Sequence, residues 1–274
     1  MKQFVLMADL DGTLIRRGQT AISEGVASVL APLIKNRCLV INSARHPEGV
    51  RYAFQGRLPF VPTIALNGAA LCEEDWTQLS KVCMFTCAAV KAVLQAVSSH
   101  NLVLSIYSAV GWWVTRINAD VEHEVVVSGM EPTLLGTMIP TEVLKMTAIG
   151  DNDALSGFEK TLTDCSSILA FARSNRRYCE ISPAGTNKTG FIVPLLEHLG
   201  LTRESVDLHF FGDSYNDIEC AAFSDSSYTF HTAPVELRRL AERIFRGETD
   251  EELVTALETI LSLAKWKKPL FRVD

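Results

Sequence analysis

FVLMADLDGT, residues 4–13, is the stretch that decides the fold. Its first five residues are apolar and lead into two aspartates and a glycine, which is typical of a strand buried on both faces and closed by a turn. Apolar runs at 38–41 and 63–66 also end in polar residues. Between these runs, apolar residues at helical spacing follow Ser23, and Pro47 suits the first position of a second helix. This alternation predicts an α/β fold with a doubly wound, parallel, Rossmann-like sheet.

The middle of the chain has a different pattern, with a helical stretch at 90–97 and then a hairpin of 102–107 and 112–117. Further elements are predicted there: helices at 121–127 and 158–163, and strands at 144–149, 168–173 and 177–181. The alternation of helices and strands that is typical of a parallel sheet returns after Pro183, with a helix at 188–199, a strand at 208–211, a short helix from Asn216, a strand at 227–230 and two closing helices. Residues 265–268 are interpreted as a solvated helix end. We therefore expect a catalytic core of residues 1–80 and 185–274, with an α+β domain of residues 81–184 inserted in it.

Composition and charge narrow the class of function. The 274 residues are 47% hydrophobic and 21% charged, as in an ordinary globular protein. A formal charge of −6 gives no general attraction to nucleic acid or to anionic membranes, and no segment is long and apolar enough to cross a bilayer. Seven scattered cysteines without a Cys-x-x-Cys pair indicate reduced thiols, so we expect a soluble cytoplasmic protein.

Three polar clusters directly follow predicted core strands: residues 9–13, 43–45 and 213–217. In open α/β sheets, ligands bind outside the carboxyl ends of the strands, so these clusters are expected to meet at one site. Asp9 and Asp11 can both point into that site if the chain bends at Gly12. One carboxylate can attack phosphorus, and the other can protonate the leaving oxygen and later accept a proton from water.

A phosphate dianion is repelled by carboxylates, so such a site requires a hard cation with oxygen ligands. Asp213 and Asp217 supply further carboxylates, and Mg²⁺ fits this donor set best. Ser43 near one helix start and Lys188 at another are suitable partners for the phosphoryl oxygens. His46 is expected either to reach the cleft or to lie at a helix start.

The chain resembles the haloacid dehalogenase-like hydrolase superfamily through four motifs that have the order and spacing of that superfamily. These motifs are Asp9-Leu10-Asp11-Gly12-Thr13-Leu14, Ser43-Ala44-Arg45, Lys188 within Thr186-Asn187-Lys188-Thr189-Gly190, and Gly212-Asp213-Ser214-Tyr215-Asn216-Asp217. The inserted α+β segment resembles the type IIB cap of the Cof-type sugar-phosphate phosphatases. The resemblance spans essentially the whole chain.

The resemblance implies a role for each carboxylate of these motifs. Asp9 would be the nucleophile and a Mg²⁺ ligand. Asp11 would be the general acid and base, and its backbone carbonyl would also bind the metal. Asp213 would be the third protein ligand, and Asp217 would support the metal shell. Dehalogenase members lack an acid two residues after the nucleophile, so Asp11 favours phosphoryl transfer.

The resemblance also implies how the phosphoryl group is held. Ser43 and Lys188 would bind it, and Asn216 would contact it or orient Lys188. The leading hypothesis is thus a phosphoric monoester hydrolase that acts on a small phosphorylated molecule, with a sugar phosphate as the expected substrate, through an aspartyl-phosphate.

Two alternatives remain. A phosphosugar mutase would use the same intermediate but return the phosphoryl group to another hydroxyl. A metabolite-binding protein without turnover is suggested by Ala44, where the family usually has Gly, and by Thr232, where Cof-type relatives often have Asn.

Overall fold

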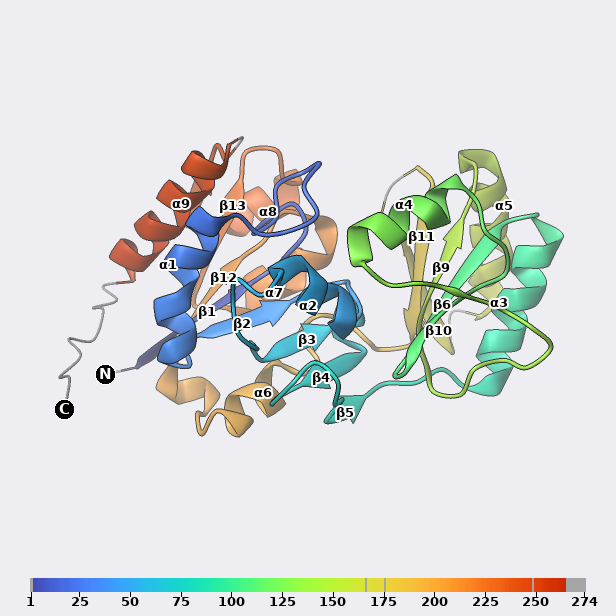
Figure 1. Ribbon diagram of the computed structural model, residues 1–274, viewed down its shortest axis with the longest axis horizontal. Coiled ribbons are helices and arrows are strands. Elements are labelled where there is room, and N and C mark those ends of the chain that lie inside the picture. Colours follow the sequence, from blue (N-terminus) through green and yellow to red (C-terminus); the bar gives the residue numbers. More distant parts are fainter. Residues whose placement is uncertain (1, 166, 175, 248, 265–274) are drawn as a thin grey trace.

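The computed structural model describes residues 2–165, 167–174, 176–247 and 249–264, which form an eight-stranded and a six-stranded sheet (Figure 1). We call the part built on the first sheet the core and the part built on the second sheet the cap. The core strands, in their order across the sheet, are β14 (Arg243–Phe245), β13 (Ser226–Phe230), β12 (Val206–Phe211), β1 (Gln3–Ala8), β2 (Leu39–Asn42), β3 (Thr63–Ala65), β4 (Ala70–Cys72) and β5 (Lys81–Val82).

β1 lies between β12 and β2 and is parallel to both. Its last residue, Ala8, is in register with Phe211 at the end of β12 and with Ile41 in β2. The loops that follow these three strands therefore leave the same edge of the sheet. Only β3, β4 and β5 pair in an antiparallel manner among the described core strands. The predicted doubly wound parallel sheet is confirmed.

Side chains of β1 alternate between two apolar layers, as the period of a strand requires. Leu6 and Ala8 pack with helices on one face, and Val5 and Met7 pack with helices on the other. The helices of the first face are α1 (Glu24–Lys35), α2 (Pro47–Phe54) and α9 (Asp250–Leu263); those of the second are α6 (Ile192–His198), α7 (Ile218–Phe223) and α8 (Val235–Leu240). All of β1 except Gln3 is buried, which explains its nearly continuous apolar sequence.

The cap is an antiparallel sheet with one parallel pair, between β7 and β8. Its strands, in order across the sheet, are β10 (Leu169–Arg173), β11 (Tyr178–Pro183), β9 (Val143–Ile149), β6 (Val103–Ser108), β7 (Gly111–Val114) and β8 (Thr133–Leu134). Helices α3 (Cys87–Ser99) and α5 (Asn152–Leu162) cover one face. Helix α4 (Ala119–Ser128) lies on the side of the cap that faces the core (Figure 1).

The cap and the core share an apolar cluster. Leu66 and Ala69, which follow β3, pack in one buried cluster with Tyr107 and Trp112 of the cap sheet. Tyr107 stacks on Trp112 with ring centroids 5.8 Å apart. The inserted cap is thus docked on the core by hydrophobic burial as well as by the polar contacts described below.

One predicted helix begins later than expected. The predicted helix at 188–199 starts only at Ile192, so Lys188 lies in a loop before α6 and not at a helix start. Pro194 favours the later start, because in the first turn of α6 its missing N–H is not needed, whereas in a helix beginning at Lys188 it would lie in the interior and remove a hydrogen bond. The Asn187 side chain closes the preceding turn by accepting hydrogen bonds from the backbone N–H and the hydroxyl of Thr189.

Four very short strands were not predicted: β4, β5, β8 and β14. β5 pairs with β4 of the core sheet at the expected start of the inserted domain, and the domain boundaries themselves stay a prediction. The predicted helix end at residues 265–268 lies outside the described residues. Among the helices of the described segments, none has the length and apolar character that crossing a membrane requires.

Candidate active site

The strand ends bring the predicted carboxylates together. Asp9 follows β1 directly, and its backbone N–H donates to the carbonyl of Phe211 at the end of β12 (2.9 Å). Asp213 and Asp217 lie in the loop and short turn after β12. One carboxylate oxygen from each of Asp9, Asp213 and Asp217 lies within 4.8 Å of the others, and all three residues are buried. A cluster of three buried carboxylates can hold a metal ion.

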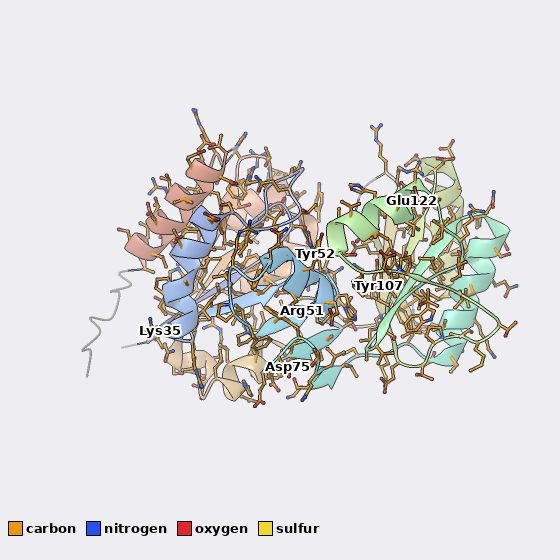
Figure 2. All side chains as sticks on the ribbon, viewed as in Figure 1. Lys35, Arg51, Tyr52, Asp75, Tyr107 and Glu122 are labelled. Carbon is orange, nitrogen blue, oxygen red and sulfur yellow. The ribbon has the colours of Figure 1, made fainter. Side chains whose placement is uncertain are left out.

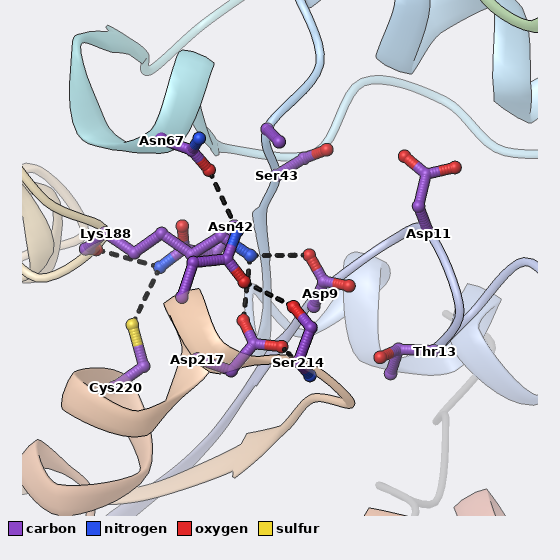
Figure 3. Close-up of polar contacts among 12 residues, drawn as sticks. Asp9, Asp11, Thr13, Asn42, Ser43, Asn67, Lys188, Ser214, Asp217 and Cys220 are labelled. Carbon is purple, nitrogen blue, oxygen red and sulfur yellow. Dashed lines mark hydrogen bonds and ion pairs between the residues drawn. The ribbon is translucent and has the colours of Figure 1, made fainter. Parts of the chain in front are cut away.

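Lys188 places a buried positive charge in this cluster. Its ammonium group lies 2.7 Å from Asp9 Oδ1 and 2.8 Å from Asp217 Oδ1, and its side chain is only 1% exposed (Figure 3). Burial alone would lower the pKa of Lys188, but the two carboxylates outweigh burial and raise it. Lys188 is therefore protonated and ties the loop before α6 to the loops after β1 and β12.

Contacts with the backbone of residues 187 and 188 hold the lysine in place. The side-chain amide of Asn42, at the end of β2, donates to the Lys188 carbonyl (2.9 Å). Gly68 adopts φ +88°, and a Cβ atom built on it would lie 1.8 Å from the carbonyl oxygen of Asn187. Only a glycine permits this close approach of the two loops.

The remaining charges of the cluster fit a hard cation. Burial raises the pKa of Asp9, and the charges of Asp217 and Asp213 add to the effect, whereas Lys188 opposes it. Burial, together with the charge of Asp217, raises the pKa of Asp213 to about 6. Oxygen ligands that repel one another in a buried site suit a divalent cation such as Mg²⁺.

Asp217 has both carboxylate oxygens occupied by the protein. Oδ1 accepts from Lys188, and Oδ2 accepts from the backbone N–H groups of Asp213 (2.9 Å) and Ser214 (3.0 Å). This arrangement suits a residue that shapes the loop and orients Lys188. It is less suited to direct metal binding than the geometry of Asp9 and Asp213.

Asp11 lies apart from the three clustered carboxylates. Gly12, at φ +82°, turns the chain, and a side chain there would collide with Asp213, because a Cβ atom would lie 2.3 Å from Asp213 Oδ2. The Asp11 carboxylate accepts two hydrogen bonds from Arg45, from Nε (2.8 Å) and Nη2 (2.6 Å). In the view of Figure 3, Asp9 lies between Lys188 and Asp11. The Asp11 side chain is 48% exposed and thus faces the opening of the site.

Ser43 and Asn216 complete the set of predicted residues. Ser43 is fully buried after β2, and its hydroxyl oxygen accepts the backbone N–H of Arg45 (3.1 Å). Asn216 is exposed and donates to Asn67 Oδ1 (3.1 Å). Asn67 also donates to Glu180 of the cap. The structure thus places Asn216 beside Asn67. The hydrogen bond that orients Lys188 is the one that its ammonium group donates to Asp217.

A cavity of about 340 Å³ opens between the core and the cap next to Lys188. The core contributes Asn67, Lys188 and Asn216, and the cap contributes Phe171 and Glu180. A small organic group can therefore reach the buried charges from the side of the cap.

A family model described as haloacid dehalogenase-like hydrolase matches residues 6–257. The chain belongs to this haloacid dehalogenase-like hydrolase family. A relative from Enterobacter sp. (strain 638), named HMP-PP phosphatase, is 30% identical over 214 residues, which are 77% of this chain and 78% of the relative. The prediction of a hydrolase of this family is confirmed, and the relative's name agrees with the predicted reaction class.

Solved structures of haloacid dehalogenase-like hydrolases share the whole fold. One from Bacteroides thetaiotaomicron has a TM-score of 0.83 at 22% identity and covers 94% of this chain and 100% of its own. A subclass IIB sugar phosphatase has a TM-score of 0.75 at 16% identity and covers 94% of this chain and 99% of its own. The predicted resemblance to members with a type IIB cap is therefore confirmed at the level of the fold.

Some site residues of this family member were not found from the sequence. Asn67 lies at a strand end, after β3, so the rule that located Asp9 and Ser43 could also have located it. Lys145 and Glu180 come from the cap and form an ion pair (3.3 Å), and Lys145 also donates to the carbonyl of Ala44 (3.1 Å). These contacts depend on how the cap docks, for which the sequence gives no local signal.

His46 is buried and starts helix α2. Its Nδ1 accepts the backbone N–H of Glu48 (3.2 Å), which makes it the N-cap residue, and its Nε2 lies 3.1 Å from the carbonyl of Ser108 in the cap. Burial lowers the pKa of His46. Of the two predicted locations, the structure thus supports the helix start, and it adds a contact with the cap.

Proposed function

We propose that this protein hydrolyses a small phosphomonoester in a Mg²⁺-dependent reaction, with Asp9 as the nucleophile. The observation that carries the proposal is the buried contact of Asp9 with Lys188 inside a cluster of carboxylates, and Lys188 also lines the cavity between core and cap. A buried lysine beside a nucleophilic carboxylate offsets the negative charge that would otherwise repel a phosphate. Family membership supports the hydrolytic class.

The proposed reaction has two steps. A carboxylate oxygen of Asp9 attacks phosphorus, the bond from phosphorus to the leaving-group oxygen breaks, and Asp11 gives that oxygen a proton. Water then attacks the phosphorus of the aspartyl-phosphate and gives a proton to Asp11, while the bond between Asp9 and phosphorus breaks and inorganic phosphate leaves. Both aspartates return to their starting states.

Mg²⁺, when bound, supplies positive charge that neutralises the phosphoryl oxygens and the carboxylates around them. We propose Asp9, Asp213 and the backbone carbonyl of Asp11 as its ligands. Asp217 supports this set through the backbone N–H groups it accepts and through Lys188. Ser43, Lys188 and Asn216 are proposed to hold the phosphoryl group, with Lys188 as the main positive charge.

The proposed substrate is a sugar phosphate. The cavity beside Lys188 carries hydrogen-bonding groups from both sides, including Asn67 and Asn216 of the core and Glu180 of the cap. Such groups match the hydroxyls of a sugar. A second candidate is HMP-PP, the compound in the relative's name, which is favoured by 30% identity over most of both chains.

The test is phosphate release from a panel of phosphoesters that includes sugar phosphates and HMP-PP, with Mg²⁺ and with a chelator. We expect activity in the parent protein with Mg²⁺, and a loss of at least about 100-fold in Asp9→Asn, since this change removes the nucleophile. Asp153→Asn, an exposed carboxylate in the first turn of α5, is the matched control and should retain activity. Equal rates in the parent and Asp9→Asn would refute the assignment of Asp9.

The same panel separates the alternatives. A mutase would yield an isomerised phosphosugar without free phosphate. A silent binding protein would bind a metabolite tightly and turn over none of the panel.

A further inference from the structure

Arg45 connects the core, the cap and Asp11 through one buried guanidinium group. Its side chain is 7% exposed although its partner Asp11 is 48% exposed. Nε and Nη2 donate to the two carboxylate oxygens of Asp11, and Nη1 donates to the carbonyls of Gly49 (3.3 Å) and Val127 (2.9 Å). The guanidinium is therefore held at three points, two in the core and one in the cap.

The fork of two hydrogen bonds fixes the orientation of the Asp11 carboxylate. A planar guanidinium matches a carboxylate in one geometry, whereas a lysine ammonium is a point charge that does not impose one. Arg45 is itself placed by its backbone N–H, which donates to the hydroxyl of Ser43. Burial disfavours the charged form of Arg45, but the hydrogen bonds and the charge of Asp11 raise the pKa of Arg45. The guanidinium therefore stays charged.

The third point of attachment belongs to the cap. Val127 lies in the last turn of α4, and residues next to it pack on α2 of the core. The ring of Tyr52 fills the space where a Cβ atom of Gly129 would lie. His46, at the start of α2, also contacts the carbonyl of Ser108 in the cap. The Nη1 group finds its cap acceptor only when α4 is docked against α2.

We propose that Arg45 is a positioning residue that orients the Asp11 carboxylate and makes this orientation depend on the docked cap. The proposal rests on the proposed function, in which Asp11 exchanges a proton with the leaving group. Undocking of α4 removes the hydrogen bond from Arg45 to Val127 and leaves the guanidinium with its core partners alone, so the orientation of the Asp11 carboxylate is less restricted. Proton transfer is thereby confined to the state in which the cap covers the substrate.

The kinetic test compares two leaving groups. An alkyl phosphate, such as a sugar phosphate, needs a proton on its leaving oxygen, whereas the nitrophenolate of p-nitrophenyl phosphate leaves without one. We expect Arg45→Ala to lower kcat/KM for the alkyl ester about 10- to 100-fold, which is less than the roughly 100- to 10,000-fold contribution of a general acid, because Asp11 itself remains. We expect less than about a 3-fold change in kcat/KM for the nitrophenyl ester, because its departure gains little from that acid and kcat/KM does not include the second step, in which Asp11 serves both esters. Equal losses for both esters would overturn the proposal.

Two further variants sharpen this comparison. Arg45→Lys keeps the charge without the fork and should show the same selective loss in a protein that folds even if Arg45→Ala does not. In the Asp11→Asn background, Arg45→Ala should cause no additional loss, since Arg45 acts through Asp11; multiplied losses would overturn the proposal. Arg51→Ala is the control and should leave both rates unchanged, because Arg51 is an exposed arginine of the following helix α2 that is paired only with Glu48 in the described contacts (Figure 2).

Hydrogen exchange gives a readout that does not depend on turnover. Arg45→Ala and Arg45→Lys should speed exchange of the backbone amides at the end of α4, and Arg51→Ala should not. Unchanged exchange in both Arg45 variants would overturn the link to the cap. A parent protein that releases phosphate from no ester would refute the proposed function and the kinetic part of this proposal, while the exchange result would still decide whether Arg45 holds the cap.

Discussion

Asp213→Asn is expected to stabilise the metal-free protein at neutral pH, although it removes a residue of the active site. Asp213 is only 6% exposed, and burial raises its pKa from 3.8 to about 6. In the unfolded chain the carboxyl group loses its proton near pH 4. Between pH 4 and 6 the folded state keeps a proton that the unfolded state has lost. The free energy of unfolding therefore falls as pH rises through this window and stays lower above it.

The magnitude follows from the size of the shift. A shift of about two pKa units at roughly 1.4 kcal/mol each corresponds to about 3 kcal/mol. Asn has nearly the shape of Asp and carries no charge, and its side-chain oxygen can still accept from the hydroxyl of Thr13. Without metal, the variant should be more stable than the parent by up to about 3 kcal/mol at pH 7.5 and equally stable at pH 4.

Urea unfolding at pH 4 and pH 7.5, with chelator, measures this difference. Asp225→Asn is the control of opposite sign, because Asp225 pairs with Arg203 and accepts the backbone N–H of Leu208, and its pKa is lowered. A lowered pKa contributes stability above about pH 4 that is lost at lower pH, so this control should be less stable than the parent at pH 7.5.

Addition of Mg²⁺ completes the test. Mg²⁺ at about 100 times its dissociation constant should raise the unfolding free energy of the parent by about 2.7 kcal/mol. It should stabilise Asp213→Asn much less, because one proposed ligand has lost its charge. The reasoning would be refuted by a variant that is less stable than the parent in chelator at pH 7.5, or by equal stabilisation of both proteins by Mg²⁺.

Two further predictions concern the loops around the site. Gly68→Ala should disrupt the Lys188 loop and lower phosphate release, because its Cβ would overlap the Asn187 carbonyl. Gly18→Ala is the control, because Gly18 has a similar φ of +86° but no atom lies within 4 Å of its Cβ position. This control should lower the free energy of unfolding only by the ~1–2 kcal/mol that a left-handed backbone costs, and it should keep activity. The lowered pKa of His46 means that, below about pH 6.5, protonation of this residue favours the unfolded chain and reduces the stability of the parent. His46→Asn should abolish this loss, which urea titrations at pH 5 and pH 7.5 measure. The prediction is contradicted if the stability of the parent relative to the variant is no lower at pH 5 than at pH 7.5.

The sequence predicted the residues that sit at strand ends and missed those whose position depends on longer-range packing. Asp9, Ser43 and Asp213 were selected because an apolar run ends directly before Asp9 and one residue before Ser43 and Asp213. Lys188 contacts Asp9 in the structure, but the helix start predicted for it was wrong, since α6 begins at Ile192, two residues before Pro194. The proline is visible in the sequence, so this error was avoidable.

The contacts between cap and core could not be predicted in the same way. Arg45 reaches Val127 across 82 residues of sequence, and Asn67 reaches Glu180 across 113. Both contacts require the cap to dock in one orientation, which is set by the shared apolar cluster around Trp112. The turn after β3 is a further case, because Leu66, Asn67 and Gly68 all have positive φ, and Leu66 gives no sign of this in the sequence.

The charges of the site explain why the same residues bear on stability and on chemistry. Lys188 balances one of the three buried carboxylates, and the other cation nearby, Arg17, is 72% exposed and 3.6 Å from Asp213, where solvent screens it. Burial, together with the nearby charge of Asp217, therefore raises the pKa of Asp213. The sheet holds these groups together against their repulsion because β1 and β12 fix the backbone on both sides. A divalent cation held by these carboxylates would offset that repulsion, which is the condition under which we propose that the cluster accepts a phosphate.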